Sequence, residues 1–158
     1  MIGSLADLAS GSGPEADSVP RIVLVDDDPG FREALREMLS DHGFDVVGEA
    51  GDGQEGVDVV SRTIPDVVLM DLRMPNLDGI QATRSIKREQ PAVQVILLSA
   101  YGDAGLRAGA EEAGVYCYLV KGCPPDIITD ALQFAWRFKL ETGQGPPAGA
   151  RQPPRPPA

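Results

Sequence analysis

Short apolar runs alternate along the chain with longer segments in which apolar residues recur at helical spacing. The apolar runs, rich in β-branched residues, lie at residues 22–25, 46–47 with their flanks, 67–70, 93–98 and 115–120. Helical spacing is found at residues 31–39, 57–60, 80–86, 103–113 and 127–140. Runs of the first kind indicate buried strands, and spacing of the second kind indicates amphipathic helices. Five strands alternating with five helices predict an α/β fold, a doubly wound parallel sheet with right-handed crossovers and helices on both faces.

The two ends of the chain are expected to lie outside this fold. Residues 1–19 are rich in Gly, Ser and Asp without sustained periodicity, and residues 142–158 contain six prolines. Segments of such composition bury too little apolar surface to offset the entropy of folding, so we expect both ends to be disordered. A single domain at residues 20–141 remains, in a chain of 158 residues.

The net charge limits the classes of partner that we expect, and the cysteine content indicates the cellular compartment. The chain carries 24 acidic and 14 basic residues, a formal net charge of -10. This charge opposes binding to phosphate backbones and anionic lipids, so we expect neither a nucleic acid nor a membrane as partner. We find neither an apolar run long enough to span a bilayer nor the pattern of a signal peptide. Cys117 and Cys123 form no CxxC motif, which favours a reducing compartment, and we expect a cytoplasmic protein.

Two polar residues are expected to cap a helix rather than to carry chemistry. His42, the single histidine, precedes Gly43 at the end of a helical pattern, where a cation suits the helix dipole. One histidine also excludes metal sites built from several histidines. Asp28 precedes Pro29, a pair typical of the cap and first residue of a helix.

Carboxylate, hydroxyl and ammonium side chains follow the predicted strands. They are Asp26, Asp27 and Asp28 after the first strand, Asp71 after the third, Ser99 after the fourth and Lys121 after the fifth. In a doubly wound sheet, ligands bind at the carboxyl ends of the strands. Clustered carboxylates repel one another unless a cation neutralises them, and oxygen ligands alone select a hard ion such as Mg²⁺. The hydroxyl and ammonium groups supply donors for an anion, which predicts a phosphoryl site whose central carboxylate can be the nucleophile.

These residues belong to four motifs whose order and spacing resemble those of receiver domains in two-component response regulators. The motifs are Val25-Asp26-Asp27-Asp28-Pro29, Met70-Asp71-Leu72-Arg73-Met74-Pro75 followed by Asp78-Gly79, Leu98-Ser99-Ala100, and Tyr118-Leu119-Val120-Lys121. The resemblance covers about residues 20–141. It implies a CheY-like, flavodoxin-like fold of five βα units with strand order 2-1-3-4-5.

The resemblance implies a role for each central residue. Asp71 would accept a phosphoryl group from the phosphohistidine of a histidine kinase or phosphotransfer protein. Asp27, Asp71 and the backbone carbonyl of Arg73 would bind Mg²⁺ directly. Asp26 would act on the ion mainly through water, and Lys121 would pair with the phosphoryl group. Such a domain assists only its own phosphorylation and dephosphorylation, so we expect no enzyme that turns over an external substrate.

Four side chains around this site are implied to respond to phosphorylation or to modulate it. Ser99 would turn toward a phosphoryl oxygen, and Tyr118 would change rotamer with it. Arg73 and Tyr101 flank the phosphorylation site, at positions that modulate the lifetime of the phosphoaspartate in this family. Signalling would then proceed through protein contacts that depend on phosphorylation. The alternative is a receiver-like adaptor that assembles through its last helix with little or no phosphorylation.

Two other phosphoryl-binding classes match part of the sequence. Gly51-Asp52-Gly53-Gln54-Glu55-Gly56 fits the GxGxxG fingerprint of dinucleotide-binding domains, but its two acidic residues would place negative charge beside a pyrophosphate. Phosphatases of the haloacid-dehalogenase type use an aspartyl nucleophile, but need a second carboxylate two residues later, where this chain has Arg73. We expect neither activity.

The helical segment at residues 103–113 is expected to be marginal. Gly105 and Gly109 lie inside it, and each glycine costs a helix about 1 kcal/mol relative to alanine. Elements that switch come from the least stable parts of a fold, so we expect this helix to shift on phosphorylation.

The helical segment at residues 127–140 is more apolar than a surface helix requires. A predicted core stripe contains Ile128, Ala131, Phe134, Ala135 and Phe138. Trp136 and Leu140 fall on other sides of the helix. In receivers, the fourth helix, fifth strand and fifth helix form the usual face for a dimer or a target. We therefore predict that Trp136 and Leu140 lie on an interaction surface, which a homodimer could use.

The residues after Lys121 depart from the Lys-Pro pair that is commonest in the family. Here Gly122 follows, then Cys123 and two prolines, similar to receivers that precede a helix-turn-helix output domain. A cis bond before proline is therefore not expected between Lys121 and Gly122. We find no helix-turn-helix pattern in the remaining residues, and expect a stand-alone regulator or a derivative of a two-domain ancestor.

Overall fold

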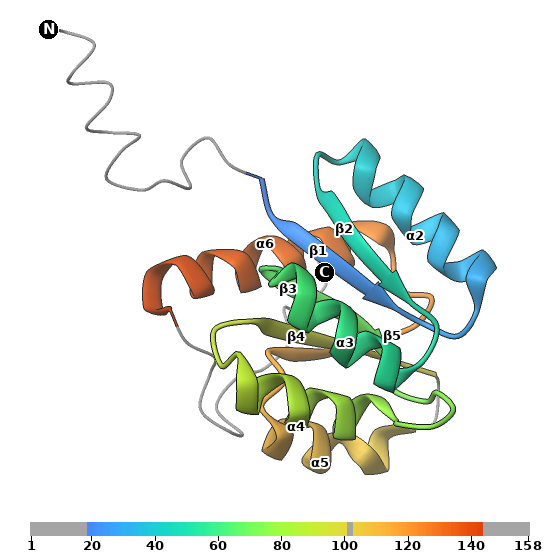
Figure 1. Cartoon of the computed structure of the whole chain (residues 1–158). Coiled ribbons are helices and arrows are strands. Elements are labelled where there is room, and N and C mark those ends of the chain that lie inside the picture. The colour runs from blue at the N-terminus through green and yellow to red at the C-terminus, as the bar shows by residue number, and fades with distance from the viewer. Residues whose placement is uncertain (1–18, 101–102, 144–158) are drawn as a thin grey trace, which may run out of the picture.

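The sheet has the predicted strand order and is parallel throughout. A computed structural model describes residues 19–100 and 103–143 of the chain. In this part of the chain, five strands form one sheet in the order β2-β1-β3-β4-β5 (Figure 1). The strands are β1 (Arg21–Val25), β2 (Asp45–Ala50), β3 (Val67–Asp71), β4 (Gln94–Ser99) and β5 (Cys117–Val120). The order places β3, which ends in Asp71, in the middle of the sheet.

Helices cover both faces of the sheet. They are α2 (Pro29–Asp41), α3 (Gly53–Thr63), α4 (Gly79–Glu89), the 3-10 helix η1 (Asp103–Leu106), α5 (Arg107–Ala113) and α6 (Pro125–Thr142). Figure 1 shows α2 and α6 on one side of the sheet and α3, α4 and α5 on the other. This arrangement is the doubly wound α/β fold that the alternation of patterns predicts.

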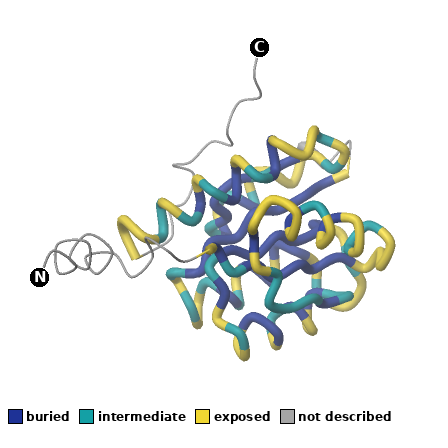
Figure 2. The backbone as a smooth tube through the Cα atoms, turned by 90° about the horizontal axis from the view of Figure 1, so that it is seen from above, coloured by how far each residue is buried: buried dark blue, intermediate teal, exposed yellow. Residues whose placement is uncertain are grey.

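Two apolar clusters hold these layers together, one on each face of the sheet. Because successive strand residues point to opposite faces, Ile22 and Leu24 of β1 pack beneath α2 and α6, whereas Val23 and Val25 pack beneath α3, α4 and α5. Every residue of β3 and β4 is buried, as parallel strands covered on both faces require. Figure 2 shows this buried interior in dark blue, with exposed residues along the outer sides of the helices.

The two predicted helix caps are confirmed. The Asp28 carboxylate accepts hydrogen bonds from the backbone N–H groups of Gly30 and Phe31, at 3.0 and 3.2 Å, and Pro29 is the first residue of α2. His42 ends the same helix, with its Nδ1 2.8 Å from the Met38 carbonyl oxygen. Gly43 follows with a φ of 86°, a conformation that glycine adopts most readily.

The structure corrects several boundaries. Val93 and Val115 precede β4 and β5 instead of belonging to them. The weak helix expected at residues 103–113 divides into η1 and a seven-residue α5 that has no side-chain cap at its start. Helix α6 runs through Thr142, one residue into the segment expected to be disordered, because the left-handed Gly143 caps it there. The other residues of the two ends, 1–18 and 144–158, lie outside the described residues.

One core prediction for α6 is wrong. The helical pattern predicts Phe134 on the core stripe, but 47% of its surface is exposed. The buried residues of this helix are Ile127, Ile128, Ala131, Leu132 and Ala135. The stripe is therefore centred nearer to Ala135 than the pattern predicts, which turns Phe134 toward solvent.

Candidate phosphoacceptor site

Three carboxylates meet at the carboxyl edge of the sheet. Asp26 directly follows β1, and Asp71 ends the neighbouring β3, whose Met70 pairs with Val25. One carboxylate oxygen from each of Asp26, Asp27 and Asp71 lies within 4.8 Å of the other two. Asp26 and Asp71 are only 2% and 6% exposed, whereas Asp27 is exposed to solvent. The predicted acidic residues thus form one cluster.

Lys121 supplies a positive charge to this cluster. Its Nζ lies 2.8 Å from Oδ2 of Asp26 and 3.4 Å from Oδ2 of Asp71. The same Nζ lies 4.5 Å from the centre of the Phe31 ring, within the range of a cation–π interaction. Because all five strands are parallel, Lys121, which directly follows β5, lies at the same carboxyl edge of the sheet as Asp26 and Asp71.

Negative charge exceeds positive charge in this cluster. Burial raises the pKa of the Asp71 carboxyl above its usual 3.8, and the Asp26 charge raises it further, while Lys121 and the Arg73 backbone only partly compensate. Burial alone would lower the pKa of Lys121, but its contacts with Asp26 and Asp71 outweigh this effect and raise the pKa above 10.5. One ammonium group therefore faces three carboxylates, and a further cation would relieve their repulsion.

The donor set fits Mg²⁺. All three side chains offer carboxylate oxygens, with no nitrogen or sulfur ligand among them. Hard divalent cations prefer oxygen ligands, and Mg²⁺ is held in proteins by one or two carboxylates with water and phosphate oxygens. The exposed Asp27 leaves one side of the cluster open to solvent.

The predicted switch residues Ser99 and Tyr118 lie on the neighbouring strands β4 and β5. Ser99, the last residue of β4, is buried, and its Oγ donates a 3.5 Å hydrogen bond to the Leu119 carbonyl. It lies one residue beyond Leu98, the residue that pairs with Asp71. Tyr118 of β5 is half-buried, with the Arg107 guanidinium of α5 6.0 Å from its ring centre. Arg73 is exposed just after β3, and Tyr101 lies outside the described residues.

Trp136 and Leu140, the predicted interaction residues, differ in exposure. Trp136 is half-buried and packs against the apolar cluster under α2 and α6. Leu140 is 39% exposed near the end of α6.

Two residues at this site were missed by sequence reasoning. Phe31 contacts Lys121 as described, and Nη1 of Arg32 donates to the Asp26 carbonyl oxygen at 2.5 Å. Both belong to the first turn of α2, directly after the acidic run. That position was the available signal, because the start of a helix following a strand end lies at the same edge of the sheet.

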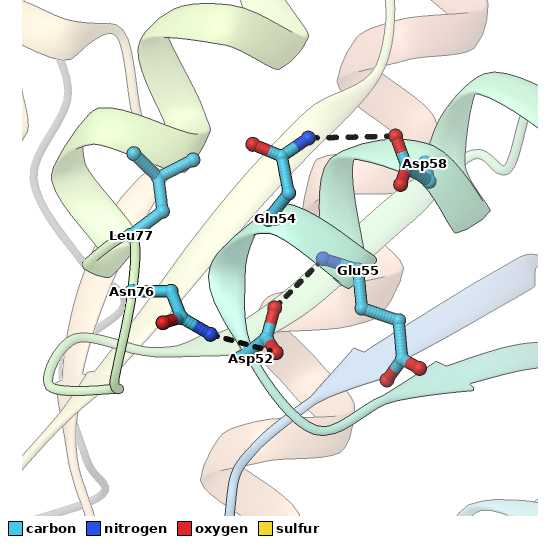
Figure 3. Close-up of a pocket in the computed structure, with 6 residues that line it drawn as sticks. All are labelled: Asp52, Gln54, Glu55, Asp58, Asn76 and Leu77. Carbon is cyan, nitrogen blue, oxygen red and sulfur yellow. Dashed lines mark hydrogen bonds between the residues drawn. The ribbon is translucent and has the colours of Figure 1, made fainter.

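Carboxylates of the glycine-rich turn before α3 accept hydrogen bonds from the turn itself and from a neighbouring loop (Figure 3). The Asp52 carboxylate accepts a 2.8 Å hydrogen bond from the Glu55 N–H and a 3.2 Å bond from Nδ2 of Asn76. The Glu55 carboxylate accepts a 2.6 Å bond from the Gly51 N–H. Carboxylates thus occupy N–H groups that a pyrophosphate would need, and acidic Asp58 lines the same hollow. This arrangement agrees with the expectation that the turn does not bind a dinucleotide.

Fold and site together define a doubly wound domain with a buried carboxylate at the carboxyl end of its central strand. The family described as the response regulator receiver domain matches residues 22–133, and the chain belongs to this family.

Individual relatives agree with this membership. The chain is 39% identical over 128 residues to the transcriptional regulatory protein PdtaR of Mycobacterium tuberculosis, covering 78% of this chain and 62% of PdtaR. It is 34% identical over 112 residues to the chemotaxis protein CheY of Thermotoga maritima, covering 71% and 93%. A receiver domain protein of Clostridium thermocellum superposes with a TM-score of 0.73 at 28% identity, covering 77% and 97%. The chain therefore spans less than two thirds of PdtaR but nearly all of CheY.

No helix in the described part of the chain is both long and apolar enough to cross a membrane.

Proposed function

We propose that this receiver domain accepts a phosphoryl group on Asp71 and signals through protein contacts that depend on phosphorylation. The observation that carries the proposal is the position of Asp71, buried at the end of the central strand with Lys121 3.4 Å away. A carboxylate in this position can attack phosphorus while the ammonium group pairs with phosphoryl oxygens.

The proposed donor is a phosphohistidine of a histidine kinase or phosphotransfer protein. An Asp71 oxygen forms a bond to phosphorus as the bond between phosphorus and the imidazole nitrogen breaks, and the imidazole leaves with the electron pair. Lys121 holds the transferred group, and the Ser99 hydroxyl donates to one of its oxygens. Bound Mg²⁺, held by Asp26, Asp27, Asp71 and the Arg73 carbonyl, would supply positive charge to the phosphoryl oxygens.

This chemistry acts on the domain itself. The phosphoryl group stays on Asp71 until water removes it, so the proposed domain turns over no external substrate and is not an enzyme in that sense. The proposal includes a cytoplasmic location, where Cys117 and Cys123, both free thiols, would stay reduced.

Incubation with Mg²⁺ and acetyl phosphate tests the proposal. Intact-mass measurement should find a gain of one phosphoryl group in the wild type and none in Asp71→Asn. Asp28→Asn is the matched control, because it removes a carboxylate of the same acidic run while asparagine still caps α2, and it should remain phosphorylatable. No gain in the wild type under saturating conditions would contradict the proposal and favour the adaptor alternative.

A further inference from the structure

Every polar group of Asp26 has a partner. Its N–H donates to the Ala50 carbonyl at 3.0 Å, and its Oδ1 accepts from the Asp28 N–H at 2.8 Å. Its Oδ2 pairs with Lys121, and its carbonyl oxygen accepts from Nη1 of Arg32. In this last contact, the charged side chain of Arg32 binds the backbone of the acidic run.

Arg32 is itself held in place from β2. Its Nε lies 3.1 Å from Oε1 of Glu49, and the other oxygen of Glu49 lies 3.3 Å from Nη1 of Arg36. The side chain of Arg32 is 21% exposed, whereas that of Arg36 is 60% exposed. One planar group thus joins α2, β2 and the end of β1, and lysine, with a single nitrogen, does not reproduce this geometry.

The Asp26 carbonyl and the Asp27 N–H belong to one planar peptide unit. A charge-assisted hydrogen bond to that carbonyl fixes the orientation of the unit, and with it the direction in which the Asp27 side chain leaves the loop. Asp27 is the exposed member of the carboxylate cluster, and its placement depends most on the backbone.

We propose that Arg32 is a positioning residue, which sets the Asp26–Asp27 peptide so that the Asp27 carboxylate faces Asp71 across the Mg²⁺ site. The inference rests on the proposed function, because it concerns the ligands of that ion. Arg32 does not itself contact the ion in this proposal. Its effect reaches the site through the backbone.

Titration of the whole, unphosphorylated chain with Mg²⁺ in a calorimeter separates positioning from charge. Removing a positive charge near a cation site should tighten Mg²⁺ binding if charge alone matters. We expect the opposite for Arg32→Gln, a dissociation constant raised about tenfold, as is typical when a partner of a metal ligand is lost. Arg36→Gln is the matched control: it removes the same charge from the same Glu49 without touching Asp26, and its binding should be unchanged or tighter.

Arg32→Lys keeps the charge, and it should weaken Mg²⁺ binding as Arg32→Gln does. Urea unfolding in metal-free buffer will show whether each variant is folded. If Arg32→Gln is not folded, Arg32→Lys alone tests the proposal. Phosphorylation by acetyl phosphate gives a second readout. The Mg²⁺ concentration for half-maximal rate should rise about tenfold in both Arg32 variants, with little change in the rate at saturating Mg²⁺.

The two ways of failing are distinct. Equal Mg²⁺ binding by the wild type and a folded Arg32 variant would overturn the positioning role and leave the proposed function intact. A wild type that binds no Mg²⁺ would contradict the proposed site itself, and the inference with it.

Discussion

At Asp71, burial and a neighbouring carboxylate act against the charge that phosphoryl acceptance requires. Its raised pKa means that the folded state binds the proton more tightly than the unfolded state, so stability falls as the pH rises through the folded pKa. We therefore expect Asp71→Asn, in metal-free buffer at pH 7, to raise the free energy of unfolding by about 1 kcal/mol. Urea unfolding measures the difference.

The difference should shrink as the pH falls through the raised pKa of folded Asp71 toward its usual value of 3.8, because protonation of the folded carboxyl removes the unfavourable charge. Asp130→Asn, at an exposed position of α6, removes one charge from the same acidic chain away from the site. If it stabilises the protein as much as Asp71→Asn does, overall charge and not the local cluster explains the gain.

The strand-end residues were predictable from sequence, whereas the helical residues beside them were not. Asp26, Asp71 and Lys121 follow apolar runs, and in a parallel sheet all strand ends of one kind lie at one edge. Phe31 and Arg32 belong to a helix, where the neighbours of a side chain depend on how the helix is rotated on the sheet. Hydrophobic periodicity does not define that rotation closely. For the same reason it places Phe134 in the core, although this side chain is exposed.

Among the elements, the start of α3 is packed directly against the loop between β3 and α4. A Cβ atom added at Gly53, the first residue of α3, would lie 1.9 Å from the Leu77 carbonyl oxygen. We expect Gly53→Ala to lower the free energy of unfolding by about 2 kcal/mol, because the backbone of the loop must move. Urea unfolding with the wild type as reference measures this loss.

Gly105→Ala is the control for this prediction. Nothing lies within 4 Å of a Cβ atom added at Gly105, in η1. Alanine there should leave stability unchanged or raise it by about 0.5 kcal/mol, since it restricts the unfolded chain. A similar loss in both variants would mean that the general properties of glycine, and not the contact with Leu77, are responsible.

Element boundaries show what apolar patterns omit. The pattern marks Val46 and Val47 with their flanks without fixing where the strand ends, and β2 continues to Ala50 because Gly48 and Glu49 pair with Val23 and Leu24 of β1. Backbone pairing requires no apolar side chain. The segment that contains Gly105 and Gly109 divides into η1 and a short α5 without a side-chain cap, a break that the apolar spacing does not mark.

At the scale of the whole molecule, periodicity predicts layers but not strand order. Alternating strands and helices satisfy many doubly wound arrangements, and hydrophobic spacing does not say which strands pair. The order 2-1-3-4-5 came from the resemblance of the motifs, and the structure confirms it. The net charge of -10 belongs to this scale too, because it opposes association between copies of the chain unless an apolar face compensates.

The two flanks of α6 offer different apolar faces for such association. The Phe138 ring lies 5.7 Å from that of Tyr116, which directly precedes β5, so this flank faces the edge strand. Phe134 is one turn earlier on the same flank, and 47% of its surface is exposed. Trp136 is about 200° around the helix from Phe134, and Leu140 lies one turn after it.

Light scattering of the phosphorylated chain distinguishes these faces. If a dimer forms through β5 and its flanking helices, Phe134→Ser should weaken it by about tenfold or more, because each copy loses a buried phenyl ring. Leu140→Ser, a similarly exposed apolar residue on the other flank, should then leave the dimer intact. The reverse result would place the contact at Trp136 and Leu140, as the sequence alone predicts. A dimer that neither substitution weakens would contradict both locations, since a symmetric interface through either flank must bury one of these two side chains twice.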